Sequence, residues 1–247
     1  PFKKTAPMKK ALVVGYGFVG KATYAFLESF DDIEIFIHDP YLEYPSIVDE
    51  EEEFDYVFLC LPTDLKNGAL DISTLIKMYG KWKGEQIIRS TIGPDQVNEF
   101  DDPTMYPEFL REVGWEQDVK QPQVEHVLGY NLASKLAYFL QENDIEATLV
   151  SPEEAAMFKI SRNAFLSMKV MYANILNKKC KQYDVSYKKV KSLLQRNLDP
   201  TTHFDVPGPD GQFGFGGKCL PKDTTHFKNL DEDPMFTTIL DLNKVIR

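Results

Sequence analysis

The chain has 247 residues, enough for one large domain or for a medium-sized domain followed by a smaller one. Hydrophobic residues make up 43% and charged residues 27%, as expected for a globular protein with a buried core. The net charge of −10 argues against nucleic acid as a partner, because an acidic surface repels a polyanion.

The cysteine count and the lack of a long apolar stretch indicate the cellular compartment in which the protein is located. Three cysteines, Cys60, Cys180 and Cys219, are too few for a disulfide framework and favour a reducing environment. The apolar stretch over residues 11–20 is about half as long as a membrane span requires, and glycines interrupt it. No signal-peptide pattern follows the basic start. We therefore expect a cytoplasmic protein without a membrane partner.

The first half of the chain alternates short apolar runs with stretches of helical periodicity. Residues 11–15 predict a buried parallel strand, and residues 18–30 predict the helix that follows it. Residues 33–37, 56–61 and 86–89 predict further strands. This alternation indicates an α/β fold with a parallel sheet and right-handed crossovers.

The second part of the chain is predicted to be helical. Ser151 and Pro152 match an N-cap and a first helical position, and the stretch up to Tyr183 contains neither glycine nor proline. We expect a long helix there, followed by a second helix, a glycine- and proline-rich loop, and a third helix. These last three elements cover residues 186–196, 199–223 and 234–247. The predicted organisation is a Rossmann-type sheet domain over residues 8–150 and an α-helical domain over residues 151–247.

Between the first predicted strand and helix lies Gly15-Tyr16-Gly17-Phe18-Val19-Gly20, which matches the pattern G-x-G-x-x-G. The first glycine permits a tight turn, the second lets a pyrophosphate approach the backbone, and the third lets helix and strand pack closely. The diphosphate would lie at the helix N-terminus, where Phe18 and Val19 begin the helix. A glycine turn without a ligand is the alternative interpretation.

An acidic residue at the end of the second strand argues against that alternative. Asp39 follows the glycine motif at the spacing expected for a carboxylate that binds both hydroxyls of an adenosine ribose. The same carboxylate would repel the 2′-phosphate of NADP. We therefore expect NAD as the cofactor.

Residues 213–223 combine a glycine-dense loop with a cysteine, lysines and an aspartate. Glycines let a substrate lie against the backbone beside the Cys219 thiol, and a nearby cation favours the thiolate, which is the nucleophile. A cysteine packed at a helix start is the alternative, and composition alone favours it.

This segment resembles the signature of the UDP-glucose/GDP-mannose dehydrogenase family, Gly-Phe-Gly-Gly-x-Cys-Phe-x-Lys-Asp. Four other motifs similar to those of the family occur in the expected order along the chain. They are Leu61-Pro62-Thr63 with Leu70-Asp-Ile-Ser73, Arg89-Ser-Thr91-Ile-Gly-Pro94, Tyr106-Pro-Glu108-Phe109-Leu110-Arg-Glu112, and Lys159-Ile-Ser-Arg-Asn163-Ala-Phe-Leu. The resemblance runs from residue 10 to the end of the chain.

The resemblance implies an NAD-dependent two-step oxidation of the C6 alcohol of a nucleotide sugar, by default UDP-glucose to UDP-glucuronate. GDP-mannose and a UDP-N-acetylhexosamine are alternative substrates. By the resemblance, Cys219 forms a thiohemiacetal and then a thioester. Lys159 and Asn163 stabilise the oxyanion, and Asp223 positions water with Lys159.

Further positions take their expected roles from the same resemblance. Thr91 and Glu112 hold a water network that accepts protons. Pro62, Thr63 and Thr91 join the glycine motif and Asp39 in binding the cofactor. Glu108, Phe109, Leu110, Phe215 and Gly216 contact the substrate, together with Lys159 and Asn163. Each also has a plain structural interpretation: a solvated lysine, a helix brace, a strand-end threonine or a surface acid. No histidine spacing suits a metal, and we predict no metal site.

Two departures from the family pattern matter. Family members continue into a second α/β domain that binds the nucleotide, which we expect to be absent here, so a truncated NAD-binding module that pairs with a full-length relative is an alternative function. The family arginine between the second helix and the cysteine loop is missing from residues 197–211.

The long helix carries an apolar stripe that we expect to form a homodimer interface. Its residues are Met157, Phe158, Phe165, Met168, Met171 and Tyr172. Packing of the stripe on the chain's own first domain is the alternative.

Overall fold

The computed structural model describes residues 8–42, 48–49, 51–122, 124–197, 205–231 and 234–247. The chain divides into two compact units. The first unit comprises the chain up to Asp64 together with Asp71–Lys159, and the second comprises Leu65–Leu70 together with Ile160–Arg247. The domain limits expected from the sequence, 8–150 and 151–247, stay a prediction.

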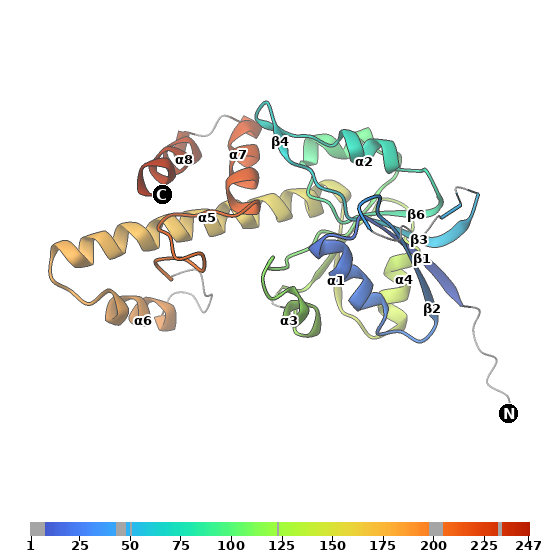
Figure 1. Cartoon of the computed structure of the whole chain (residues 1–247), viewed down its shortest axis with the longest axis horizontal. Coiled ribbons are helices and arrows are strands. Elements are labelled where there is room, and N and C mark those ends of the chain that lie inside the picture. The colour runs from blue at the N-terminus through green and yellow to red at the C-terminus, as the bar shows by residue number, and fades with distance from the viewer. Residues whose placement is uncertain (1–7, 43–47, 50, 123, 198–204, 232–233) are drawn as a thin grey trace. The chain divides into compact units, whose positions relative to one another are not determined.

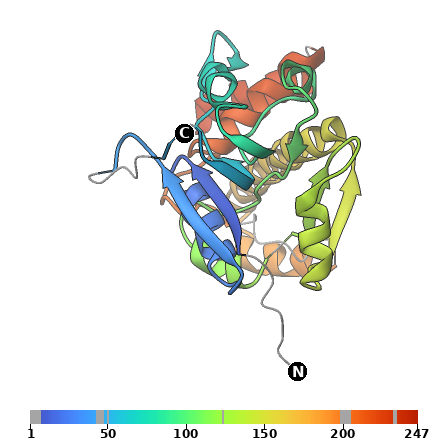
Figure 2. The ribbon, with the colours of Figure 1, turned by 90° about the vertical axis from the view of Figure 1, so that its right-hand side faces the viewer.

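Seven strands of the described residues form the sheet of the first unit (Figure 1). Their spatial order is β2 (Ile33–His38), β1 (Lys9–Val14), β3 (Glu53–Leu59), β6 (Lys83–Ile88), β7 (Thr104–Met105), β8 (His126–Gly129) and β9 (Ala147–Val150). Neighbouring strands are parallel except for β7 and β8. Figure 2 shows β2 and β9 at opposite edges. Since β2 and β3 lie on opposite sides of β1, the carboxyl end of β1 is the kind of switch point at which open α/β sheets bind ligands.

Helices cover both faces of this sheet. They are α1 (Phe18–Leu27), α2 (Ser73–Met78), α3 (Trp115–Lys120), α4 (Lys135–Glu142) and the 3-10 helix η1 (Pro94–Glu99). Val13 and Phe58 belong to a core that also contains Leu27 of α1 and Phe139 of α4. Leu12, next to Val13 and therefore on the opposite face, is fully buried as well. Burial on both faces explains why the parallel strands are continuous apolar runs.

The second unit is helical. It contains most of α5 (Pro152–Gln182), then α6 (Tyr187–Asn197), α7 (Cys219–Asp231), α8 (Pro234–Ile246), and the hairpin of β4 (Leu65–Lys66) and β5 (Ala69–Leu70). Its small core joins Ala164 and Met171 of α5 to Phe236 and Ile239 of α8, with Phe215 between them in sequence. Asn229 of α7 donates a hydrogen bond to the Gly68 carbonyl of the hairpin.

The start of α5 follows its sequence signals. The Ser151 hydroxyl accepts a hydrogen bond from the Glu154 N–H at 3.2 Å, and the Glu154 carboxylate accepts one from the Ser151 N–H at 2.8 Å. This reciprocal capping satisfies backbone donors that have no partner within the helix. Within the described residues, none of the helices is both long enough and apolar enough to cross a membrane.

The predicted fold class, a parallel α/β sheet followed by helices, is confirmed. One helix was not predicted, because residues 219–223, expected to end a loop, are the first turn of α7. Pro221 had favoured a loop, but proline is tolerated in a first helical turn, where its missing N–H has no intrahelical partner. Part of that loop, residues 198–204, lies outside the described residues. The strands β7, β8 and β9 were not predicted, because two to four residues carry little periodicity.

Candidate active site

The glycine motif joins the carboxyl end of β1 to the start of α1 in the first unit. Gly15 has a φ of +87°, and a Cβ there would lie 2.6 Å from the Cys60 carbonyl oxygen, so only glycine fits this turn. A Cβ on Gly20 would overlap the carbonyl oxygen of Gly15. Gly17 is exposed, and a Cβ added to it would meet no atom within 4 Å. The first and third positions thus require glycine for close packing, whereas glycine at the second position leaves the backbone accessible to a ligand.

The N-terminus of α1 is suited to an anion. Its N-cap, Gly17, makes no side-chain hydrogen bond, and the first turn holds no acidic residue. The backbone N–H groups of a first turn, here including Phe18 and Val19, lack intrahelical partners and point outward. Together with the helix dipole they favour a negatively charged ligand.

Asp39 follows β2 and reaches back to the glycine motif. Its Oδ2 accepts a hydrogen bond from the Tyr16 N–H at 2.6 Å, and its Oδ1 accepts one from the Tyr41 N–H at 2.9 Å. These two bonds hold the half-buried carboxylate beside the turn. A carboxylate has about four acceptor sites, so lone pairs remain for a ligand's hydroxyl groups.

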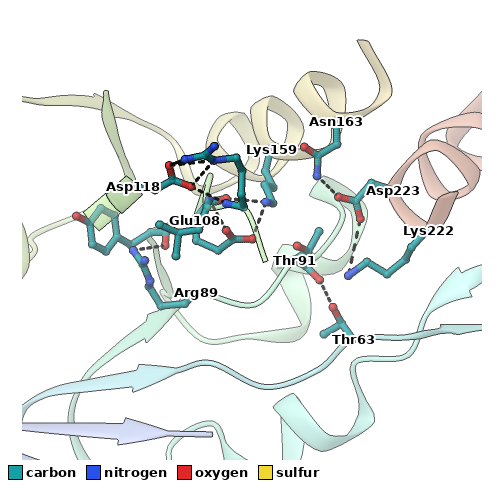
Figure 3. A network of polar contacts seen from close by, with 12 residues as sticks. Thr63, Arg89, Thr91, Glu108, Asp118, Lys159, Asn163, Lys222 and Asp223 are labelled. Carbon is teal, nitrogen blue, oxygen red and sulfur yellow. Dashed lines mark hydrogen bonds and ion pairs between the residues drawn. The ribbon is translucent and has the colours of Figure 1, made fainter. Parts of the chain in front are cut away.

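The chain beyond β3 meets the chain beyond β6 through two threonines. The Thr63 hydroxyl donates to the Thr91 carbonyl at 2.7 Å, and both residues are buried (Figure 3). Pro62, next to them, is exposed. This hydrogen bond therefore joins the two segments at the carboxyl end of the sheet.

Alanine substitutions at Gly20 and Gly17 are expected to separate packing from ligand access. Gly20→Ala should lower the free energy of unfolding by about 2 kcal/mol or more, because the new methyl group overlaps backbone. Gly17→Ala should change it by less than about 1 kcal/mol, because its site is open and its φ of −67° suits alanine. Urea unfolding of both variants measures this. Equal losses would contradict the assignment.

A buried ion pair links the segment after β7 to α5. Lys159 Nζ lies 2.8 Å from Glu108 Oε1 and 2.6 Å from the Glu108 carbonyl oxygen, and the two residues are 3% and 5% exposed. The N–H of Leu110 donates to the other carboxylate oxygen at 2.7 Å. Figure 3 shows Lys159 pointing toward Glu108.

These contacts set the charge state of Glu108. Burial alone would raise the pKa of this carboxyl group, because a low dielectric disfavours the anion. The charge and hydrogen bond of Lys159, the N–H of Leu110 and the charge of Arg89 outweigh burial and hold the pKa of Glu108 below its usual value. Glu108 is therefore a carboxylate at neutral pH.

The residues after Glu108 differ in their surroundings. The Phe109 ring packs on the Phe158 ring at a centroid distance of 5.2 Å, and Lys159 Nζ lies 5.5 Å from the Phe109 centroid. Leu110 is half-buried, whereas Glu112 is exposed. The structure thus brings Glu108 and Lys159 together and leaves Glu112 at the surface.

In the second unit, α5 and α7 hold a buried amide–carboxylate pair. Asn163 Nδ2 donates to Asp223 Oδ2, and the two side chains point toward one another in Figure 3. One turn further, the hydroxyls of Ser167 and Thr224 lie 2.6 Å apart. Asp223 is fully buried, and among the described residues its Oδ1 has no hydrogen-bond donor, although Lys222 Nζ lies 3.8 Å away. Such an oxygen calls for water or a ligand group.

Cys219 is the first residue of α7 and is half-buried, whereas Cys60 and Cys180 are buried. A helix N-terminus favours negative charge, which suits a thiolate. Gly216 is half-buried, but the Phe215 side chain is only 2% exposed and lies in the core of the second unit. The Phe215 ring therefore packs in the core, and Gly216 is the more accessible of the two residues.

Comparisons with known proteins agree with this arrangement. Residues 153–244 match the UDP-glucose/GDP-mannose dehydrogenase family, central domain. GDP-mannose 6-dehydrogenase of Pseudomonas aeruginosa is 29% identical over 226 residues, which cover 76% of this chain and 50% of that protein. The second part of the chain is therefore similar to the central domain of this family. UDP-glucose 6-dehydrogenase of Rickettsia bellii is 26% identical over 206 residues, 74% of this chain and 46% of that protein.

Among solved structures, a UDP-glucose dehydrogenase from Pyrobaculum islandicum has the same fold. It aligns with a TM-score of 0.79 at 18% identity, over 99% of this chain and 70% of that one. The chain spans about half the length of the curated relatives it matches.

Four residues from the motifs that resemble those of the UDP-glucose/GDP-mannose dehydrogenase family form two contacts. Glu108 bonds to Lys159 across 51 residues of sequence, and Asn163 bonds to Asp223 across 60. Lys159 and Asn163 are one turn apart on α5. The motifs predict each residue as part of the site, but they predict neither pairing, because no local pattern reports on partners so far apart in sequence.

A polar cluster beside Glu108 was not predicted from the sequence. A cavity of about 70 Å³, room for a few water molecules, has Glu108, Arg89, Tyr106 and His126 among its polar and apolar lining residues. The Tyr106 hydroxyl lies 2.5 Å from His126 Nδ1, and Arg89 stacks 4.4 Å from the Tyr106 ring centre. Burial raises the pKa of Tyr106 to about 12 and lowers the pKa of His126. The sequence feature that could have indicated this cluster is Arg89, a single charged residue at the end of an apolar strand.

Proposed function

We propose that this chain is an NAD-dependent nucleotide-sugar 6-dehydrogenase, which oxidises a C6 alcohol to a carboxylate in two steps, with UDP-glucose as the default substrate. The contacts of Glu108 with Lys159 and of Asn163 with Asp223 support this proposal most directly, because they use residues of the family motifs. GDP-mannose and a UDP-N-acetylhexosamine are alternative substrates for the same chemistry.

The residues of the first unit fit NAD. The open backbone at Gly17 and the uncapped α1 N-terminus suit a diphosphate, and Asp39 suits an adenosine ribose. Thr63, Thr91 and Pro62 would border the other half of the dinucleotide. When bound, NAD accepts a hydride from the substrate carbon.

In the first step the C6 carbon loses a hydride and its hydroxyl loses a proton, which gives an aldehyde. Water held by Thr91 and Glu112 would take up the proton, with Glu108 on the sugar side. Lys159 has three N–H bonds and uses two on Glu108, so one is left for the developing oxyanion. Asn163 similarly keeps one amide hydrogen beyond its bond to Asp223.

In the second step the Cys219 sulfur bonds to the aldehyde carbon, and the oxygen takes a proton to give a thiohemiacetal. Loss of a second hydride and of that hydroxyl proton leaves a thioester. Water then attacks the carbonyl carbon, the carbon–sulfur bond breaks, and carboxylate and thiol are released. Asp223 Oδ1, buried without a donor among the described residues, would accept the proton of this water. Per alcohol, one water is consumed and two NADH and three protons are formed.

Replacing Asp39 with alanine is expected to weaken NAD binding by about 10- to 100-fold, because two hydrogen bonds to ribose are lost. Asp32→Ala is the matched control, since Asp32 pairs with Lys9 at 3.3 Å at the start of the same strand. Calorimetric titration with NAD measures both. Unchanged affinity in the Asp39 variant would remove this residue from the cofactor site.

The function itself is tested by NADH formation from NAD and a panel of UDP-glucose, GDP-mannose and UDP-N-acetylhexosamines. Turnover on one sugar, with the matching uronate as product, supports the proposal and names the substrate. NAD binding without turnover on any sugar would refute the proposal that the chain is an enzyme. It would favour an NAD-binding module that pairs with a longer relative.

We also propose a homodimer through α5. Met157, Phe158, Phe165 and Tyr172 are 39% to 54% exposed on this helix, an unusual apolar surface for a monomer. Met168 and Met171 of the same stripe instead pack in the core of the second unit. Light scattering tests the proposal, and a monomeric mass at micromolar concentration would refute it.

A further inference from the structure

Two asparagine side chains hold the loop that precedes Cys219 in the second unit. Asn243 of α8 accepts a hydrogen bond from the Phe215 N–H at 2.8 Å through Oδ1, and its Nδ2 donates to the Phe215 carbonyl at 2.9 Å. Asn174 of α5 accepts one from the Gly214 N–H at 3.2 Å. Side chains of two helices are thus hydrogen-bonded to the loop backbone.

Both amides have a defined orientation. Asn174 is 5% exposed, and its Nδ2 donates to the Val170 carbonyl at 2.8 Å, so its oxygen faces the loop. A Cβ on Gly214 would lie 2.5 Å from Asn243 Oδ1, so the absence of a side chain there leaves room for the second amide. The buried Phe215 ring adds an apolar anchor at the same place.

We propose that Asn243 and Asn174 are positioning residues that fix the backbone from Gly214 to Cys219 and thereby the location of the Cys219 thiol. The inference rests on the proposed function, in which that thiol attacks an aldehyde. Glycine at positions 214, 216 and 217 allows many backbone conformations, so the loop does not order itself. A displacement of about 1 Å at a reacting atom costs about 100-fold in rate.

Asn243→Ala removes both bonds to Phe215. Asn243→Asp keeps the acceptor for the N–H but places an oxygen against the Phe215 carbonyl, and it serves if the alanine variant does not fold. Thr238→Ala is the matched control, because the Thr238 hydroxyl bonds to the Pro234 carbonyl of the same helix. Hydrogen exchange of residues 213–219, NADH turnover and NAD affinity are measured on the whole chain.

In either Asn243 variant we expect exchange in residues 213–219 to accelerate by about tenfold or more. We expect kcat to fall by about 30- to 100-fold while NAD affinity is unchanged, and Thr238→Ala to match the unsubstituted chain. Unchanged exchange, or faster exchange with full kcat, would overturn the inference.

A failure of the proposed function can be distinguished from a failure of the positioning role of Asn243. If the unsubstituted chain oxidises no sugar, the rate at which iodoacetamide alkylates Cys219 replaces kcat as the readout. Cys60 and Cys180, both buried, are internal references in the same mass spectrum. A change of about fivefold or more in the Asn243 variants supports positioning of the thiol, and an unchanged rate overturns it.

Discussion

Replacing Cys219 with serine is expected to abolish formation of the uronate, with a loss of about 10³-fold or more in NADH turnover. A serine hydroxyl stays protonated at neutral pH and is a weak nucleophile, so neither the thiohemiacetal nor the thioester forms. Binding of NAD should be unchanged, because its proposed residues lie in the first unit and Cys219 lies in the second. Chromatography of the sugar products together with calorimetry of NAD checks both parts.

Cys180→Ala is the matched control for this substitution. Cys180 lies in the same unit and is 6% exposed, and the proposed reaction does not use it. We expect it to keep kcat within about twofold while it loses some stability from the deleted sulfur. Uronate formed at the normal rate by the Cys219 variant would refute covalent catalysis by this thiol.

Replacing Lys159 with methionine is expected to lower the free energy of unfolding by about 3–5 kcal/mol, because it leaves the Glu108 carboxylate buried without its counter-charge. Lys83→Met is the matched control, since Lys83 pairs with Glu53 at the same 2.8 Å distance but both side chains are 70% exposed. Solvent screens an exposed pair, so we expect Lys83→Met to change the stability far less than Lys159→Met. Urea unfolding measures both variants.

The double variant Lys159→Met with Glu108→Gln shows whether the two groups act as a pair. We expect it to recover part of the stability lost in Lys159→Met, because the uncompensated charge is gone. Additive losses from the two single substitutions would contradict a direct interaction.

The same pair predicts a pH dependence. Because the folded pKa of Glu108 lies below its ordinary value of 4.5, the ion pair stabilises the fold above that value, and this contribution is lost as the pH falls through the folded pKa. Glu108→Gln should therefore flatten the decline in unfolding free energy below pH 4.5 relative to the unsubstituted chain. A parallel decline in both proteins would show that Glu108 is not held as a carboxylate.

Features of this protein that depend on neighbouring residues were predictable from the sequence. The positive φ of Gly15, the contact of Gly20 with the Gly15 carbonyl and the cap at Ser151 each depend on the local backbone or on residues a few positions away. Parallel strands buried on both faces leave continuous apolar runs, so the class of fold was predictable too. The sequence motifs were also sufficient to predict the candidate residues of the site.

Only the tertiary structure decided which of those groups meet. Glu108 contacts Lys159, Asn163 contacts Asp223, and Asn243 contacts Phe215, although dozens of residues separate the partners in sequence. The path of the chain between such partners decides their distance, and no local periodicity encodes it. The short strands β7 to β9 are likewise specified by pairing with the sheet, because two to four residues have too little intrinsic preference to form a strand alone.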